Sequence, residues 1–206
     1  MALPKIIDNK RKSFLDIFAK AADLHDELSV ATGYWDIGAM ELTMEQLRKF
    51  KKVRLLIGRE PLIPRHHLND PEPDYPDKDF KFDLSHVSPE SKLRDTVTEI
   101  KRLMAEGQLE VRIYRKTFLH AKCYIFGNYD SDQAIGIIGS SNFTKNGITT
   151  NTELNALEDD HRIVTFKPQT EQQEVGHLFW FDELWSDPAT EAWNEQFGTI
   201  LEQSPV

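Results

Sequence analysis

Two apolar runs in the second half of the chain constrain its fold more than any other feature. FLHAKCYIF covers residues 118–126 and AIGIIG covers residues 134–139. Each run is short, rich in aliphatic and aromatic residues, and followed by glycine, asparagine or serine, which is typical of buried strands. We therefore predict strands over 117–126 and 134–139. The first run also contains a histidine and a lysine, and burying either without a partner costs free energy, so both need an explanation.

Helical and strand patterns alternate along the rest of the chain. Predicted helices cover 11–28, 38–50 and 89–107, the last with Ser88 and Pro89 at its start and Gly107 as its stop. Residues 59–87 hold five prolines and indicate a long irregular excursion. The alternation predicts an α/β fold with helices on both faces of a sheet. The remaining predicted elements are strands within 28–35 and over 53–58, 109–114 and 151–157, a helical turn near 142–147 and an aromatic-rich helical tail from about 170.

The bulk properties favour one domain. A chain of 206 residues, 39% of them hydrophobic, is long enough for one packed core and short for two. The N-terminus has no apolar run of signal-peptide length, and no stretch of the chain is apolar enough to span a bilayer. The single cysteine, Cys123, excludes an internal disulfide or a cysteine-rich zinc site, and we expect it to be buried. We expect a soluble, cytoplasmic protein with no membrane partner.

Charge is distributed unevenly. The net charge of −9 argues against a surface coated with basic residues for non-specific nucleic-acid binding. Between residues 111 and 125, however, no residue is acidic. Such a patch suits a compact anion such as phosphate; solvation of an edge strand is the alternative interpretation. The basic residues and the histidine of this patch are Arg112, Arg115, Lys116, His120 and Lys122.

Strand geometry places the histidine and the lysine side by side. Successive side chains of a strand point to opposite faces, so His120 and Lys122 share one face, about 7 Å apart along the strand. One phosphate fits this pair, with the lysine neutralising an oxygen while a histidine nitrogen reaches the phosphorus. The same face carries Phe118, Tyr124 and Phe126, and the opposite, apolar face carries Leu119, Ala121, Cys123 and Ile125.

The strand over 134–139 ends in small polar residues. Ser140, Ser141 and Asn142 follow Gly139, at the kind of strand end where ligands bind in open α/β sheets. Their N–H groups, hydroxyls and carboxamide suit anionic oxygens; a helix N-cap is the alternative interpretation. Glu153 lies eleven residues further on, and its carboxylate could accept the far N–H of His120. That bond would fix the tautomer of the imidazole and raise the basicity of its nucleophilic nitrogen.

Together, these segments resemble the HKD motif of the phospholipase D superfamily. The match consists of His-x-Lys at 120–122, Gly-Ser-x-Asn at 139–142 and Asn-x-Glu-x-Asn at 151–155. Within the superfamily, FLHAKCYIF…AIGIIGSSNFTKNGITTNTELNA is most similar to nuclease domains found alone, in restriction endonucleases or at the N-terminus of bacterial helicases. The likeness extends over roughly residues 10–160. The aspartate of the motif, five residues after the lysine, is replaced by Gly127, with Asp130 and Asp132 just beyond.

The resemblance implies a phospholipase D-like α-β-α sandwich, that is, a mixed central β-sheet flanked by helices on both faces, with a helical C-terminal tail. It divides the chain into a catalytic domain over 1–168 with one HKD motif and a helical extension over 169–206 that could lead to a downstream domain.

The implied chemistry uses no metal and no cofactor. His120 attacks a phosphodiester to form a phosphohistidine, and Lys122 stabilises the developing charge. Asn142 and Glu153 complete the catalytic group. Ser140, Ser141 and Arg115 join Lys122 and Asn142 in binding the substrate phosphate.

The active site of the family uses two motifs, and this chain has one. The resemblance therefore implies a homodimer in which each subunit supplies its His120. The predicted activity is that of a metal-independent nuclease with DNA as the expected substrate and a helicase domain or subunit as a candidate partner. Two alternatives stay open: a catalytically silent nucleic-acid-binding domain that serves a helicase, and a phospholipid phosphodiesterase or transferase.

Two other groups of residues are of interest. RHHLNDPEPD, at 65–74, contains two histidines and three acidic residues, but it has no ligand spacing on a regular element, and a solvated loop or lid is favoured over a metal site. The aromatic residues of the tail recur at helical spacing, which favours packing over base stacking. They are Trp180, Phe181, Trp185, Trp193 and Phe197.

Overall fold

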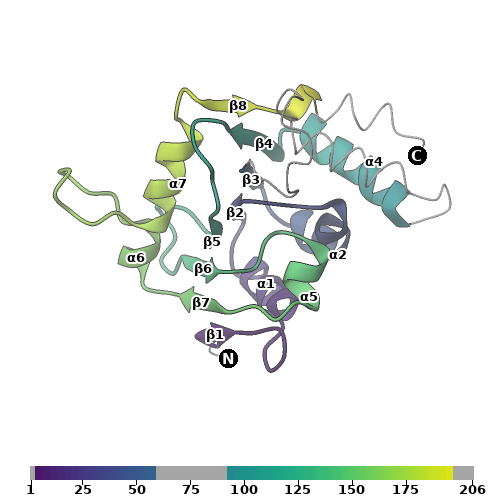
Figure 1. The fold of residues 1–206 in the computed structure, drawn as a ribbon, viewed down its shortest axis with the longest axis horizontal. Coiled ribbons are helices and arrows are strands. Elements are labelled where there is room, and N and C mark those ends of the chain that lie inside the picture. Colours follow the sequence, from purple (N-terminus) through teal and green to yellow (C-terminus); the bar gives the residue numbers. More distant parts are fainter. Residues whose placement is uncertain (1–2, 59–91, 197–206) are drawn as a thin grey trace, which may run out of the picture.

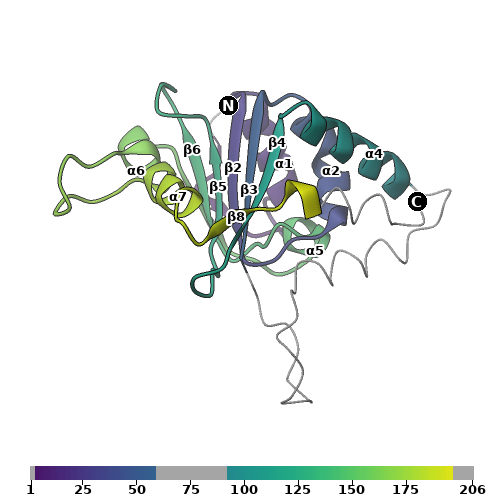
Figure 2. The same cartoon turned by 90° about the horizontal axis from the view of Figure 1, so that it is seen from above.

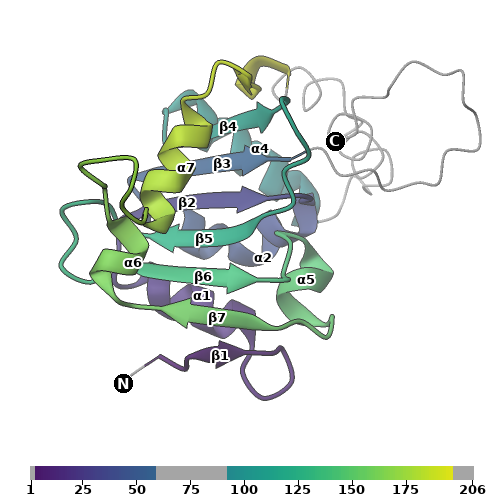
Figure 3. The ribbon, with the colours of Figure 1, turned by 60° about the vertical axis from the view of Figure 1, so that its left-hand side comes forward.

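The computed structural model describes residues 3–58 and 92–196. Its centre is one mixed sheet of eight strands in the order β1-β7-β6-β5-β2-β3-β4-β8, with helices on both faces (Figure 1, Figure 3). This arrangement confirms the predicted α/β fold. The strands are β1 (Ile6–Ile7), β2 (Glu27–Thr32), β3 (Lys52–Ile57), β4 (Leu109–Tyr114), β5 (Lys122–Phe126), β6 (Ile135–Gly139), β7 (Asn155–Glu158) and β8 (Thr190–Ala192).

Strand direction brings several polar segments to one end of the sheet. β2, β3 and β4 are parallel, so their carboxyl ends lie together. β5 runs antiparallel to β2, β6 to β5 and β7 to β6. β5 and β7 therefore begin, and β6 ends, where β2, β3 and β4 end. We call this end the carboxyl end of the sheet.

The helices form two layers, as Figure 2 shows from above. α1, α2, α4 and α5 cover one face, and α6 and α7 cover the other. Figure 3 also shows that α6 and α7 lie over the part of the sheet away from its carboxyl end. The helices are α1 (Phe14–Ala22), α2 (Ile37–Leu47), α4 (Lys92–Ala105), α5 (Lys145–Thr149), α6 (His161–Thr165) and α7 (His177–Trp185).

Apolar alternation along the strands produces two buried cores. Tyr124 and Phe126 of β5 pack with α1, where Phe14 and Phe18 meet them edge to face at ring-centroid distances of 4.8 and 5.2 Å. Cys123 and its neighbours on the other face pack against α7. Burial raises the pKa of the Cys123 thiol to about 12, which agrees with the predicted buried apolar role.

Most predicted elements are present with shorter bounds. The helix predicted over 11–28 ends at Ala22, and Leu28 belongs to β2. Gly107 follows α4 with φ of +72°, as expected of a helix stop, whereas Ser88 and Pro89 lie outside the described residues. The strand predicted over 117–126 is confirmed only from Lys122 onward, so the placement of His120 on an interior strand is wrong. The prediction for 151–157 likewise holds only from Asn155.

The C-terminal segment combines the predicted helix with a strand that the sequence pattern did not indicate. α7 packs on the sheet through Phe181 and Trp185, which confirms packing as the role of these aromatic residues. Arg54 of β3 lies over the Phe181 ring at 4.7 Å and pairs with Asp182 at 2.5 Å. β8 then joins the sheet beside β4. The segment that follows residue 176 is therefore part of the same sheet structure as far as it is described.

Candidate active site

The connection between β4 and β5 carries His120 across the carboxyl end of the sheet. Its course depends on two glycines at the ends of β3 and β2. A Cβ atom on Gly58 would lie 2.1 Å from the Leu119 carbonyl oxygen, and one on Gly33 would lie 3.2 Å from Cδ2 of His120. The N–H of Gly33 also donates to Ala121 O at 3.0 Å. Leu119 is buried, and His120 is exposed at the surface of this end of the sheet.

Lys122 is the first residue of β5 and pairs with Thr32 of β2. Its side chain is only 7% exposed, and its Nζ donates to the carbonyl oxygen of His120 at 3.1 Å. The lysine ammonium is thereby held against the residue that bears the candidate nucleophile. His120 and Lys122 therefore come from the loop before β5 and from the start of that strand, and the predicted placement of their two side chains around one phosphate stays a prediction.

The turn after β6 lies next to this pair because β6 and β5 are adjacent and antiparallel. The Oδ1 atom of Asn142 accepts the backbone N–H of Tyr34 at 3.2 Å and lies 3.4 Å from the Thr32 hydroxyl. These contacts join the end of β6 to the end of β2. Since the carboxamide oxygen is engaged with Tyr34, the amide nitrogen of Asn142 is the donor left to offer to a phosphate.

Ser141 has a different environment from its neighbours in the turn. It is fully buried, and its hydroxyl accepts a hydrogen bond from Asn155 Nδ2 at 2.9 Å. Its N–H donates to Asn155 Oδ1 at 3.2 Å, and its carbonyl accepts the Tyr124 hydroxyl at 2.8 Å. These bonds favour a structural role for the Ser141 side chain, and the predicted phosphate contact stays a prediction. Asn155 is therefore a supporting residue of the site that the motif indicated only by its spacing.

Glu153 lies immediately before β7, at the same end of the sheet. Its carboxylate accepts a hydrogen bond from the Ser140 hydroxyl and another from Asn151 Nδ2 at 3.3 Å. Ser140 Oγ also accepts the N–H of Leu154 at 3.0 Å. The structure thus brings Glu153 to the turn after β6, and the predicted bond from Glu153 to His120 stays a prediction.

Asp36 is a supporting residue that the sequence analysis missed. As the N-cap of α2 it accepts the N–H of Ala39 at 2.8 Å, and it also accepts the N–H of Lys145 at 2.9 Å, where α5 begins. One carboxylate therefore fixes two helix starts beside the end of β2 and the turn after β6. Burial raises the pKa of Asp36, against the opposing effect of these N–H donors. An N-cap pattern before GAMEL was the available signal.

Arg115 lies at the same end of the sheet but is not adjacent to the pair. It follows β4, which β3 and β2 separate from β5, a displacement of about 14 Å at the usual strand spacing. Its Nε donates to Glu191 of β8 at 2.6 Å. Lys116 similarly pairs with Asp187 at 3.2 Å. The C-terminal segment thus anchors the start of the connection that carries His120, and direct phosphate binding by Arg115 stays a prediction.

Gly127, in place of the motif aspartate, lies at the opposite end of β5 from Lys122. Its φ is +102°, and an added Cβ would lie 2.7 Å from the Ser131 hydroxyl. The adjoining turn is closed by the N–H of Asn128, which donates to that hydroxyl at 2.9 Å. The replacement therefore affects a turn about five residues, or roughly 17 Å, from the phosphate-binding pair.

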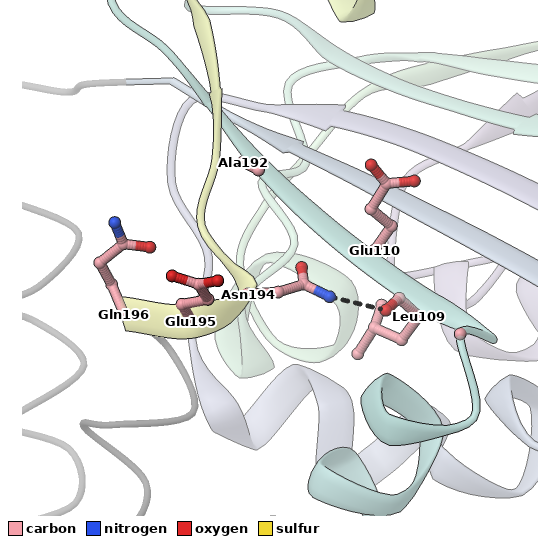
Figure 4. Close-up of a pocket in the computed structure, with 7 residues that line it drawn as sticks. Leu109, Glu110, Ala192, Asn194, Glu195 and Gln196 are labelled. Atoms are coloured by element: carbon pink, nitrogen blue, oxygen red, sulfur yellow. Dashed lines mark hydrogen bonds between the residues drawn. The ribbon is translucent and has the colours of Figure 1, made fainter.

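A pocket at the other end of the sheet is separate from this site. Figure 4 shows it beside β4 and the residues after β8, with Glu110 and Glu195 on its wall. Asn194 donates to Leu109 O at 3.3 Å and accepts the N–H of Val111 at 2.7 Å, so it ties the chain after β8 to the start of β4. The pocket is acidic and lies at the amino end of β4, which makes it a poor candidate for binding phosphate.

Two further observations concern the described residues only. Within 3–58 and 92–196, no three histidine, cysteine or acidic side chains are grouped closely enough to hold a metal ion. The histidine-rich segment at 65–74 lies outside these ranges. None of the helices in the described part is long and apolar enough to cross a bilayer.

A mixed α/β sheet with a histidine, a lysine and a Ser-Ser-Asn turn at one end belongs to the class of α/β folds that can bind a ligand at their strand ends. Comparison with protein families agrees with this class. The family model for the cardiolipin synthase PLD-like domain matches residues 20–172. The chain therefore belongs to the phospholipase D-like domain family. Among curated proteins, none matches it significantly.

Solved structures resemble this chain at low sequence identity. The phosphatidylserine synthase of Haemophilus influenzae Rd KW20 superposes with a TM-score of 0.54 at 15% identity, over 98% of this chain and 46% of that one. This chain thus spans somewhat less than half of that enzyme. Nuc from Salmonella typhimurium, a phospholipase D family member, gives 0.45 at 13% identity, over 86% of this chain and 88% of Nuc. Yeast tyrosyl-DNA phosphodiesterase 1 gives 0.39 at 12% identity, over 70% of this chain and 27% of that one.

Proposed function

We propose that the protein is a metal-independent nuclease in which His120 is the nucleophile. The observation that carries the proposal is the bond from Lys122 Nζ to His120 O, which holds a buried cation against the backbone of the residue that bears the exposed imidazole. A phosphate that meets the imidazole there has its charge neutralised at the point of attack. Asn142, fixed by Tyr34, supplies a further donor from the adjacent strand end.

The reaction has two displacement steps. A ring nitrogen of His120 attacks phosphorus, a phosphohistidine forms, and the bond from phosphorus to the leaving oxygen breaks. The leaving oxygen takes a proton from a second histidine, which afterwards removes a proton from the water that hydrolyses the phosphohistidine. The second histidine is His120 of another copy of the chain, brought in by two-fold symmetry.

An exposed apolar surface beside the site supports this dimer. Ile6, Ile138 and Leu154 are 51%, 36% and 63% exposed. Ile7, Ile137 and Leu157 point into the core on the α1 side, so by alternation Ile6 and Ile138 lie on the opposite face of the sheet. Leu154 comes directly before β7. Ile6 and Ile138 both pair with Ala156 of β7, which makes one continuous row. An uncharged surface of this kind suits the centre of a protein interface.

DNA is the proposed substrate, and the overall charge of −9 requires that its binding be local rather than distributed over the surface. The lysine and the strand-end donors supply such a local contact. A downstream helicase domain or a helicase subunit is proposed as the partner that delivers the nucleic acid. The phosphatidylserine synthase with the same fold makes a phospholipid headgroup the competing substrate.

The decisive experiment measures cleavage of plasmid, single-stranded DNA and labelled phospholipid in excess EDTA. We expect nucleic-acid cleavage that survives EDTA, is lost in His120→Ala, and passes through an acid-labile adduct on His120. Activity that appears only with Mg²⁺ or Mn²⁺ and persists in His120→Ala would overturn the proposal. Binding of DNA without any cleavage would identify a silent binding domain, and cleavage of phospholipid alone would identify a lipid enzyme.

A further inference from the structure

One aromatic ring at the candidate active site has no role in the proposed mechanism. The side chain of Phe118 is 51% exposed, and its ring is stacked on the His120 imidazole with a centroid separation of 5.2 Å and an interplanar angle of 18°. In the described part of the chain, the other aromatic side chain of comparable exposure is Tyr129, in the turn at the opposite end of β5. An exposed phenyl ring beside the candidate nucleophile is therefore a candidate contact for a ligand.

The position of this ring is fixed by the backbone. Leu119 lies between Phe118 and His120, is 6% exposed, and has its carbonyl oxygen fitted against Gly33 and Gly58. The residues on either side are consequently held at the surface while the leucine is anchored in the core. The phenyl ring is thus a preorganised surface and loses little freedom when a ligand covers it.

The charge around the ring limits what can cover it. The nearby donors, Lys122 Nζ and the amide of Asn142, suit a phosphate, whereas the ring itself offers a flat apolar face. A ligand that satisfies both has a phosphate next to a planar ring, as a nucleotide unit of a single strand has. Stacking of bases on aromatic side chains is tolerant of sequence and is the usual mode of single-strand binding.

We propose that Phe118 forms a base-stacking subsite, in which the base next to the cleaved phosphodiester lies on the outer face of the phenyl ring. The inference rests on the proposed nuclease function and names its substrate class as unpaired nucleic acid. The base, Phe118 and His120 then form one column, so that binding of the base also sets the distance from phosphate to imidazole. Phe118 acts as a specificity-determining residue.

The test measures binding of two ligands with equal numbers of phosphates: a short single-stranded oligodeoxyadenosine and its fully abasic analogue. Both are measured in the Lys122→Met background, which keeps the Phe118 and His120 rings and should slow the proposed cleavage by about 10²- to 10³-fold. We expect the oligonucleotide to bind about 5- to 150-fold more tightly than the abasic analogue, the range typical of one stacked base. Phe118→Leu should abolish most of that difference and Phe118→Trp should preserve it. Fluorescence of 2-aminopurine in the strand should be quenched only when an aromatic ring is present at position 118.

Tyr129→Leu is the matched control, because it removes an exposed aromatic ring at the far end of the sheet. It should leave the ratio of the two affinities unchanged. Equal weakening of the binding of both ligands by Phe118→Leu would overturn the subsite. The subsite would also be overturned if Phe118→Leu lost binding to phosphatidylglycerol vesicles while it kept its binding to the oligonucleotide. The cleavage assay is a separate test. Base-dependent quenching without cleavage would support the subsite and refute the nuclease. Cleavage with equal binding of the oligonucleotide and its abasic analogue would support the nuclease and refute the subsite.

Discussion

The ammonium nitrogen of Lys122 and the carbonyl oxygen of His120 lie 3.1 Å apart and form a hydrogen bond. The bond connects the start of an interior strand with the loop before it, and so joins the lysine and the histidine of the motif through the backbone. It also means that the lysine has both a positioning role and an electrostatic role.

Lys122→Met should lower turnover by about 10²- to 10³-fold, the usual loss on removing one donor to a developing anion. Methionine retains the apolar stem and removes a buried charge, so the midpoint of thermal unfolding should stay the same or rise. Kinetics and calorimetry on the same preparation check both expectations. A fully active Lys122→Met variant would contradict the assignment of the ammonium group to the phosphate.

Asn142→Asp tests the donor role of the carboxamide. The aspartate keeps an oxygen acceptor for the N–H of Tyr34, so the turn should remain folded. It replaces the amide donor with a negative charge that repels phosphate, and we expect kcat/KM to fall by about 10²- to 10³-fold. Asn142→Ala removes both functions and should in addition lower the unfolding midpoint. Comparison of the two variants by kinetics and calorimetry separates catalysis from stability.

Glu153→Gln should lower turnover by about 10²- to 10⁴-fold with little change in substrate affinity, as expected when a histidine loses its orienting carboxylate. The bond from the Ser140 hydroxyl to Glu153 provides a second test. If the carboxylate acts on His120, Ser140→Ala should have a much smaller effect than Glu153→Gln. Equal losses in the two variants, accompanied by a lower unfolding midpoint, would instead assign Glu153 to holding the turn after β6.

The sequence was sufficient to predict the elements whose apolar period is long and regular. The cores of α1, α2 and β2 to β6 follow from alternation or helical spacing, and the strand-end position of Asn142 followed from a break after glycine. Short elements with few residues to set a period were missed, namely β1, α6 and β8. Their stability comes from pairing with strands far away in the chain, which a local pattern does not record.

The environment of individual site residues was harder to predict. Alternation placed His120 on the strand because the run 118–126 is apolar throughout, yet residues 117–121 cross the ends of β3 and β2 instead. The reason is the close approach of Leu119 O to Gly58 and Gly33, both of which are far from Leu119 in the sequence. Ser140 and Ser141 are indistinguishable by residue type, but only Ser141 is enclosed by Tyr124 and Asn155.

Stability should fall as the pH drops below the ordinary histidine value of 6.5, with His177 as a main contributor. The Nδ1 atom of His177 is buried without a hydrogen-bond partner, and burial lowers the pKa of this residue against the opposing charge of Glu158. The unfolded chain then binds the proton more tightly than the folded one, so acid favours unfolding by at most about 1.4 kcal/mol per pH unit for one group.

His177→Gln should therefore flatten the dependence of the unfolding midpoint on pH below 6.5, as measured by calorimetry in a series of buffers. His25, whose Nε2 is also buried without a partner and whose pKa is lowered by burial, should supply part of the slope that remains. An unchanged slope in His177→Gln would show that this histidine binds its proton equally well in the folded and unfolded states, and would contradict the lowered pKa.

Leu154→Arg should convert the proposed dimer into a folded, inactive monomer. Leu154 is 63% exposed on the apolar row next to Ser140 and Glu153, and a charge on each copy would be repeated across a two-fold axis. We expect light scattering at tens of micromolar to report half the mass, and turnover to fall with the dimer fraction because each site lacks its second histidine. Leu24→Arg, at a leucine that is 65% exposed beside the start of β2, should change neither mass nor turnover. An active Leu154→Arg monomer would refute the two-copy mechanism, whereas an intact, active dimer would place the interface elsewhere.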